Sequence, residues 1–146
     1  MLSSDQKGAV AESAIVHAAV KLGIGVSKPL TDGERYDLIF DLGSRLVRVQ
    51  CKWANQRGEV ILVRCYSSRR GRERLMRRPY TSDEVDAIAA YCADLDRCYF
   101  LPSSIIDSRA EVSLRLGSTR NGQRLRIRWA DEFEFTRLDW GRLTGP

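Results

Sequence analysis

The first periodic pattern along the chain is that of an amphipathic helix over residues 5–22 (DQKGAVAESAIVHAAVKL). Apolar residues recur there at three- and four-residue spacing, which places them on one helix face. These residues are Ala11, Ile15, Ala18 and Leu22. Gly23 follows and is typical of a helix end. At about 100° per residue, Glu12 falls at the border of the apolar face and His17 on nearly the opposite, solvent-facing side.

Strand patterns follow after a turn-rich loop. Residues 36–41 and 45–53 are rich in β-branched and aromatic side chains, and the connection between them contains Gly43. This arrangement is typical of an antiparallel hairpin. A further apolar run at 59–67 (EVILVRCYS) predicts a third strand that extends the sheet.

Alternation along the hairpin sorts its side chains into two faces. One face is apolar, and we expect it to pack against a helix. It comprises Tyr36, Leu38, Phe40, Val47, Val49, Cys51 and Trp53. The other face carries Asp37 together with Gln50 and Lys52. An acid is therefore expected opposite an amide and an amine.

A second helix is predicted from residue 81 to about residue 92. Thr81 and Glu84 form a capping-box pattern, in which two side chains satisfy free backbone N–H groups at a helix start. The residues expected on its buried face are Val85, Ile88, Ala89 and Cys92. The next run, RCYFLP at 97–102, predicts a strand that Pro102 ends. A helix between two strands is a crossover connection, so we expect a mixed sheet.

The C-terminal part alternates apolar and basic residues on both sides of Asn121-Gly122, a dipeptide typical of hairpin turns. We therefore predict an additional C-terminal hairpin. The apolar residues expected to cover the core are Leu114, Leu116, Leu125, Ile127 and Trp129. The arginines expected to point outward, as a basic ribbon, are Arg115, Arg124, Arg126 and Arg128.

Length and composition indicate a single globular domain spanning residues 1–146, with 43% hydrophobic and 29% charged residues. No apolar run is long enough to span a bilayer, and the N-terminus lacks the features of a secretory signal, so we expect a cytoplasmic protein. None of the four cysteines is spaced as Cys-x-x-Cys, which favours reduced, mostly buried thiols over a zinc or redox site.

The net charge of +5 is concentrated in one segment. Residues 69–78 (RRGRERLMRR) contain six arginines and one glutamate, which together account for the whole net charge. An arginine cluster neutralises phosphates and releases their counterions, and so provides sequence-independent affinity for nucleic acid. The candidate DNA contacts are Arg69, Arg70, Arg72, Arg74, Arg77 and Arg78. A solvated, mobile loop is the alternative interpretation.

The polar face of the hairpin would suit metal-assisted hydrolysis of a phosphodiester if the helix brings Glu12 beside it. Magnesium prefers hard oxygen ligands. Asp37 and Glu12 would provide carboxylates, while Gln50 would provide its side-chain carbonyl and Cys51 its backbone carbonyl. Lys52 would orient or help deprotonate the attacking water and place positive charge near the developing phosphorane. An exposed ion pair is the alternative, and spacing alone favours it.

Six segments spread over nearly the whole chain carry a family resemblance. They are KGAVAE (7–12), RYDLIFD (35–41), RVQCKW (48–53), TSDEVDAIAAY (81–91), CYFLP (98–102) and NGQRLRIRWADEFE (121–134). Together they resemble the PD-(D/E)XK nuclease superfamily, and most of all the branch that includes group I intron-encoded homing endonucleases. That branch has Gln in place of the usual second acid.

The resemblance implies an α/β fold with a restriction-endonuclease-like core, in which helices flank a mixed central sheet. It also implies a magnesium-dependent cut in double-stranded DNA, with Mn²⁺ as a possible substitute. The family's site positions fall on Glu12 (helix acid), Asp37 (metal-binding acid), Gln50 (variable Glu or Gln) and Lys52. The neutral Gln50 leaves two carboxylates instead of three, from which we expect weaker magnesium affinity or tolerance of one metal.

The expected function is site-specific, homing-type cleavage of DNA. We expect a homo-oligomer, either a dimer or a tetramer, because one small active site cuts one strand. The protein would be associated with the nucleoid when it is bound to DNA. Two alternatives stay open: a structure-specific junction or repair nuclease, and a non-catalytic DNA-binding protein that retains the nuclease core.

Overall fold

A seven-stranded sheet organises the part of the chain that the computed structural model describes, which is residues 1–70, 72–117 and 126–143. The strands of this sheet are β1 (Gly25–Ser27), β2 (Leu38–Asp41), β3 (Leu46–Arg57), β4 (Val60–Arg64), β7 (Ala87–Cys92), β8 (Arg97–Pro102) and β9 (Glu111–Arg115). A separate two-stranded sheet is formed by β5 (Tyr66–Arg70) and β6 (Leu75–Pro79). The helical elements are α1 (Ser4–Lys21), α2 (Ser103–Ile106), η1 (Ala130–Glu132) and α3 (Trp140–Leu143).

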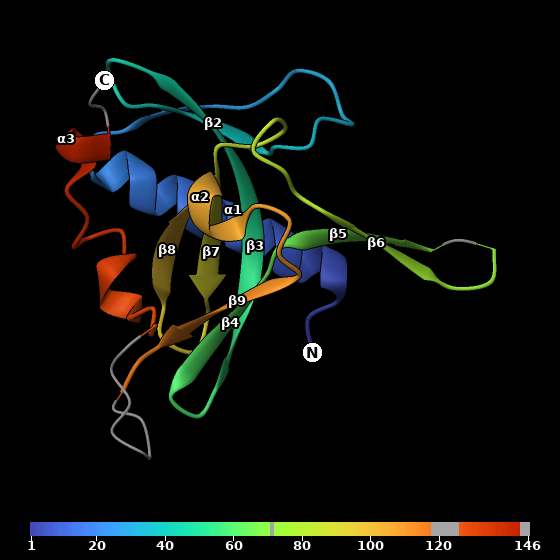
Figure 1. Ribbon diagram of the computed structural model, residues 1–146. Coiled ribbons are helices and arrows are strands. Elements are labelled where there is room, and N and C mark those ends of the chain that lie inside the picture. Colours follow the sequence, from blue (N-terminus) through green and yellow to red (C-terminus); the bar gives the residue numbers. More distant parts are fainter. Residues whose placement is uncertain (71, 118–125, 144–146) are drawn as a thin grey trace.

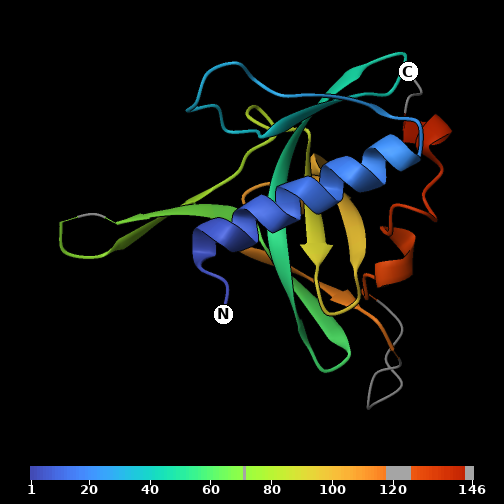
Figure 2. The ribbon, with the colours of Figure 1, turned by 180° about the vertical axis from the view of Figure 1, so that it is seen from behind.

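Strand β3 is the centre of the sheet. Its first half pairs antiparallel with β2 and parallel with β7, and its last residues pair antiparallel with β4. The α1 helix runs obliquely across one face of the sheet, and α2 lies on the other (Figure 1, Figure 2). The mixed sheet between helices confirms the predicted fold class.

The first helix forms as predicted, with one correction at its end. Ser3 caps it through a reciprocal pair of hydrogen bonds with Gln6. The residues that it buries against the sheet are Ala11, Ile15 and Ala19. Leu22 was expected on this face but is 40% exposed. The helix ends at Lys21, so Leu22 is already part of the turn that Gly23 completes with a φ of +83°.

The predicted second helix is wrong, because Ala87–Cys92 is strand β7. Ile88 and Ala90 pack into the core on one side of the sheet, and Ala87 and Ala89 pack into the core on the other. A strand buried on both faces is apolar throughout, and over a few residues such a run does not differ from a buried helix. The Thr81 and Glu84 pattern forms a turn, in which the Thr81 hydroxyl lies 3.2 Å from Glu84 Oε1.

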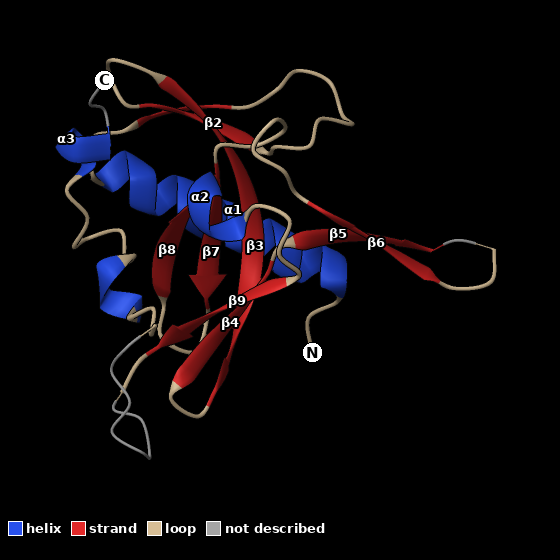
Figure 3. Cartoon of the chain, in the orientation of Figure 1, coloured by secondary structure: helices blue, strands red, loops and turns tan. Residues whose placement is uncertain are grey.

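The predicted third strand divides at Cys65. Residues before it form β4, and Tyr66 begins β5, which pairs with β6 to form an arm that stands clear of the body (Figure 3). We call residues 66–79 the β5–β6 arm. The described residues of the segment 69–78 belong to this paired hairpin or to its tip.

The predicted C-terminal hairpin is not found in the residues that the structure describes. Strand β9 pairs antiparallel with β4, so it extends the main sheet. The one bridge between β9 and the following segment joins Arg115 and Trp129, and it is parallel, whereas a hairpin would be antiparallel. The Asn121-Gly122 turn, Leu125 and Arg124 lie outside the described residues.

Two buried cores lie on the two faces of the sheet. The core beneath α1 contains Leu38, Phe40, Val47, Val49 and Cys51, as alternation predicted. Tyr36 was expected there but packs against the opposite core, because β2 begins only at Leu38. The C-terminal segment closes the α1 side through an aromatic cluster of Phe40, Phe100, Phe135 and Trp140.

All four cysteines lie within the described residues, and each is a buried free thiol, as expected. Among the helices of the described residues, none is both long enough and apolar enough to cross a bilayer.

Candidate active site

Asp37 lies just before β2, and β3 holds it in place. Its backbone N–H donates to Val49 O (2.9 Å), and its Oδ2 accepts a hydrogen bond from the Cys51 N–H (3.0 Å). These two hydrogen bonds hold Asp37 against Val49–Cys51, the stretch of β3 that contains Gln50.

Glu12 reaches the same place from α1. It is half-buried, and its carboxylate forms an ion pair with the ammonium group of Lys28. Glu12, Lys28 and Lys52 all act electrostatically on Asp37, so these four side chains share one neighbourhood. Sequence analysis missed Lys28, because no local pattern links the loop after β1 to the middle of α1.

The surroundings of Asp37 disfavour its charge. Burial raises the pKa of Asp37 above its usual value, although the hydrogen bond from the Cys51 N–H acts in the opposite direction. The negative charge of Glu12 raises this pKa further, because two nearby carboxylates repel one another. A divalent cation bound here would supply positive charge and relieve both effects.

Lys52 is held at the root of the β5–β6 arm. Its Nζ donates to the backbone O of Tyr66 (2.8 Å) and lies 5.1 Å from the centroid of the Tyr80 ring. Burial lowers the pKa of Lys52, while the negative charge of Asp37 opposes this change. Lys52 is thus a half-buried amine within the electrostatic influence of Asp37.

The oxygen donors of the site fit a hard divalent cation. The Gln50 side-chain amide lies beside the Cys51 carbonyl, with Nε2 donating to Cys51 O at 3.4 Å. A half-turn of the amide would exchange its nitrogen for its oxygen, so that two carbonyl oxygens would be neighbours. Together with Asp37 and Glu12, this set contains only oxygen atoms, which Mg²⁺ and Mn²⁺ prefer. Among the described residues, no group of three or more His, Cys, Asp or Glu side chains could hold a metal.

Comparisons with known proteins identify the family of the chain. A family model described as PD-(D/E)XK endonuclease matches residues 2–136. The chain belongs to this family. It is therefore a DNA endonuclease, and nucleases of the family generally use divalent metal ions.

A solved structure gives the same answer. The structure of a bacterial homing endonuclease, I-Ssp6803I, has a TM-score of 0.73 and 27% sequence identity to this PD-(D/E)XK endonuclease. The similarity covers 98% of this chain and 94% of the other. A search of curated proteins found no significant match.

The β5–β6 arm carries part of the endonuclease's predicted DNA-contacting surface. Arg72, Arg74, Arg77 and Arg78 are all exposed. Arg77 lies over the Tyr66 ring at 4.8 Å, and Arg78 pairs with Glu84 at 2.7 Å, so these two hold the root of the arm. The side chains of Arg69 and Arg70 lie outside what the structure describes.

The predicted basic ribbon is only partly present. Arg126 is exposed, whereas Arg115 and Arg128 are half-buried. The backbone N–H of Arg115 donates to the backbone oxygen of Arg128 at 2.8 Å, which joins the two segments. These three arginines help to line a hollow of about 440 Å³. The arm and the end of β9 project to opposite sides of the molecule (Figure 1), so they form two separate basic surfaces.

Sequence analysis missed a polar hollow of about 380 Å³ at the root of the arm. Arg57 and Arg64 come from β3 and β4, and Arg77 comes from the arm. Each arginine lies in an ordinary strand pattern, and only the pairing of β4 with β3 and the position of the arm bring the three together.

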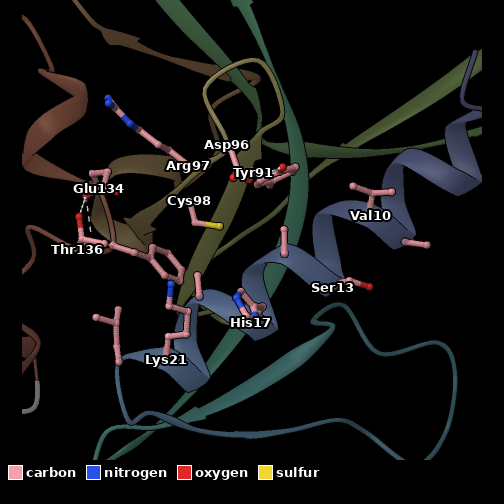
Figure 4. Close-up of a pocket in the computed structure, with 15 residues that line it drawn as sticks. Val10, Ser13, His17, Lys21, Tyr91, Asp96, Arg97, Cys98, Glu134 and Thr136 are labelled. Atoms are coloured by element: carbon pink, nitrogen blue, oxygen red, sulfur yellow. Dashed lines mark hydrogen bonds between the residues drawn. The ribbon is translucent and has the colours of Figure 1, made fainter.

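A hollow of about 730 Å³ does not coincide with the candidate active site. It lies between α1 and the segments around Cys98 and Phe135. Figure 4 shows His17 and Lys21 projecting from α1, with Tyr91 and Cys98 on the opposite wall. None of Glu12, Asp37, Gln50 or Lys52 lines it. Its wall is mostly apolar, so we place the chemistry at the carboxylates. His17 is exposed, as predicted.

We predict that Asp37→Asn stabilises the metal-free protein. Because the pKa of Asp37 is raised in the folded state, the free energy of unfolding decreases as pH rises through that pKa. It increases again at lower pH, where the carboxyl group is protonated. The asparagine side chain carries no charge, so the free-energy cost of a buried charge is absent. Its amide oxygen can still accept the hydrogen bond from the Cys51 N–H. In EDTA at pH 7 the midpoint of thermal unfolding should rise above that of the wild type, and the difference should shrink as pH falls.

Asp41→Asn is the matched control, since Asp41 is an exposed carboxylate at the end of the same strand. It should leave the unfolding midpoint close to that of the wild type. A lower midpoint for Asp37→Asn would contradict the assignment of a disfavoured charge.

Proposed function

We propose that the protein is a Mg²⁺-dependent, site-specific endonuclease of the homing type that cleaves double-stranded DNA. The observation that carries this proposal is the meeting of Asp37, Glu12, Gln50 and Lys52 where α1, β2 and the root of the arm come together. Similarity to a homing endonuclease over nearly the whole of both chains supports the homing type.

Asp37 and Glu12 would hold the metal through carboxylates, and Gln50 and the Cys51 backbone through carbonyl oxygens. Manganese should substitute for magnesium, because both prefer oxygen ligands. The bound ion would lower the pKa of a water molecule and neutralise charge on the phosphate. Glu12 would exchange its present partner, Lys28, for the metal. With only two carboxylates, we expect modest magnesium affinity.

Lys52 would orient the attacking water and stabilise negative charge on the phosphate. Its fixed position, at 2.8 Å from Tyr66 O, favours such an electrostatic role. The lowered pKa of Lys52 also makes its amine easier to deprotonate than that of a free lysine. The negative charge of Asp37 acts in the opposite direction and favours the charged form.

The β5–β6 arm would place the duplex through phosphate contacts from its exposed arginines. The polar hollow of Arg57, Arg64 and Arg77 would continue this basic surface from the arm to the body. Arg69 and Arg70 would add to the contact made by the arm, and Arg115, Arg124, Arg126 and Arg128 would form a second contact. Such contacts position the duplex, whereas base contacts would select the target site.

A homo-oligomer, either a dimer or a tetramer, would account for a double-strand break, since each site cuts one strand. We place the protein in the cytoplasm, associated with the nucleoid when it is bound to DNA.

We predict that wild-type protein, incubated with phage DNA and Mg²⁺, produces fixed DNA ends, and that Ca²⁺ supports binding without cleavage. Lys52→Ala should reduce the cleavage rate by about 10²–10³-fold, because a preorganised charge at the reacting phosphate is lost. Its DNA affinity, measured in Ca²⁺, should stay within a few-fold of the wild type.

Lys21→Ala is the control, since Lys21 is an exposed lysine on α1 that lies outside the site. Unchanged cleavage by Lys52→Ala would overturn the site assignment. Ends scattered over the DNA would exclude site-specific cutting, and a preference for branched over linear duplex would indicate a junction or repair nuclease. Binding without cleavage in Mg²⁺ and Mn²⁺ would indicate a non-catalytic DNA-binding protein.

We predict a steep loss of DNA affinity with salt. Each phosphate contact contributes about 0.9 to the slope of log K against log salt. Replacing both Arg72 and Arg74 by Ala should therefore lower that slope by up to about two. Binding measured between low and physiological salt tests this, with Arg137→Ala, remote from the arm, as control. An unchanged slope in the double variant would remove these two arginines from the interface.

We predict that a mixed oligomer of wild-type and Lys52→Ala subunits nicks its target instead of cutting both strands. Subunits carrying different tags would be co-purified as heteromers and incubated with a supercoiled plasmid that contains the mapped site. Nicked circles should accumulate. Linear product at the wild-type rate would show that one subunit cuts both strands.

A further inference from the structure

Both ends of the β5–β6 arm meet the catalytic lysine. Tyr66, the first residue of β5, provides the backbone oxygen that accepts the hydrogen bond from Lys52. Tyr80, which directly follows β6, places its ring 5.1 Å from Lys52 Nζ and is buried. The position of the lysine therefore depends on how the root of the arm is seated.

Arg35 forms hydrogen bonds to both strands at this root. Its Nη1 donates to Ser67 Oγ (2.6 Å) on β5, and its Nη2 donates to the backbone oxygens of Arg78 (3.2 Å) and Pro79 (3.0 Å) on β6. The guanidinium group also lies 4.1 Å from the centroid of the Tyr80 ring.

Glu84 adds a carboxylate to the contacts at the root of the arm. Its Oε2 lies 3.1 Å from Arg35 Nε and 2.7 Å from Arg78 Nη2, so one carboxylate joins the body to the arm. The side chains of Arg35 and Glu84 are each only 19% exposed, which reduces screening of their charges by water. Only the guanidinium group of arginine, which is planar and has several N–H donors in fixed directions, can make this set of contacts.

Arg35 lies two residues before Asp37 in the same segment. That segment carries a proposed metal ligand, while the arm carries the hydrogen-bond acceptor and the aromatic ring that hold Lys52. Arg35 is the side chain that joins the two parts.

We propose that Arg35 is a positioning residue that seats the β5–β6 arm against the active site, so that Lys52 is aligned with the Asp37 centre when the arm binds DNA. This inference rests on the proposed function. It separates two roles of the arm: arginines near the tip bind DNA, and the root aligns the lysine.

The electrostatics around Lys52 agree with this role. Burial is the main cause that lowers the pKa of Lys52, and the positive charges of Arg35 and Arg64 add to it. Asp37 and the Cys65 thiol act in the opposite direction, and Tyr80 is the facing titratable ring.

The test compares Arg35→Ala and Arg35→Lys with the wild type in the full-length protein. DNA affinity is measured in Ca²⁺, and single-turnover cleavage is measured in Mg²⁺ with protein in excess. We expect affinity within a few-fold and a cleavage rate about 100-fold lower in both variants, because a small misplacement of a catalytic group has an effect of that size. Arg35→Lys keeps the charge but not the planar guanidinium group, so it should not restore the rate.

Arg48→Ala is a matched control for stability. Arg48 makes a similar set of contacts, to Asp86 and to the backbone oxygens of Ser82 and Asp83, and these contacts lie away from the arm and Lys52. It should lower the midpoint of thermal unfolding and leave the single-turnover rate of the folded fraction within a few-fold. Ser67→Ala removes one of the hydrogen bonds that Arg35 makes to the arm. This variant should fold, and its cleavage rate should fall by less than that of Arg35→Ala.

The comparison of DNA affinity with cleavage rate separates positioning from loss of structure. Arg35→Ala should lose rate but not affinity, whereas Arg48→Ala should lose neither in its folded fraction. Wild-type rates in Arg35→Ala and Ser67→Ala, or equal losses of affinity and rate, would overturn the role of Arg35. If Lys52→Ala also cleaved normally, the proposed site itself would have failed.

Discussion

The structure depends on keeping two charged side chains partly buried at the point where α1, β2 and β3 meet. Asp37 is tied to β3 through the Cys51 N–H and the Val49 carbonyl, so neither of its groups can turn toward solvent without breaking sheet hydrogen bonds. Lys52 is tied to the arm through Tyr66. Burial acts on the two in opposite directions, raising the pKa of the acid and lowering that of the amine.

This constraint explains why the surrounding elements take the positions that they do. The carboxylate of Glu12 needs a helix across the sheet, and that helix buries Ile15 and Ala19 in the same core as Phe40. Lys28 neutralises Glu12 in the absence of metal. The parallel pairing of β3 with β7 buries the strand that carries Gln50 and Lys52 in the middle of the sheet, where its register is strongly determined.

Local patterns were enough to predict the first helix, the β2–β3 hairpin and the shared location of Asp37, Gln50 and Lys52. Period-two alternation determines which side chains meet once the pairing is known. The same patterns predicted a helix at Ala87–Cys92, because a strand buried on both faces has no alternation. They also missed Arg35 and Lys28, whose partners lie in segments distant in sequence. For the site residues, the order of six segments carried information that spacing alone did not.

The β5–β6 arm touches the active site only at its root. Its tip, by contrast, is joined to the rest of the molecule through a single hairpin, and the exposed Leu75 and Met76 bury little surface there. Substitutions and changes in length near the tip should therefore have little effect on the folded body and on the surroundings of Asp37. The outer part of the arm is thus free to vary in sequence while the residues at its root are constrained by their contacts with Lys52 and Arg35.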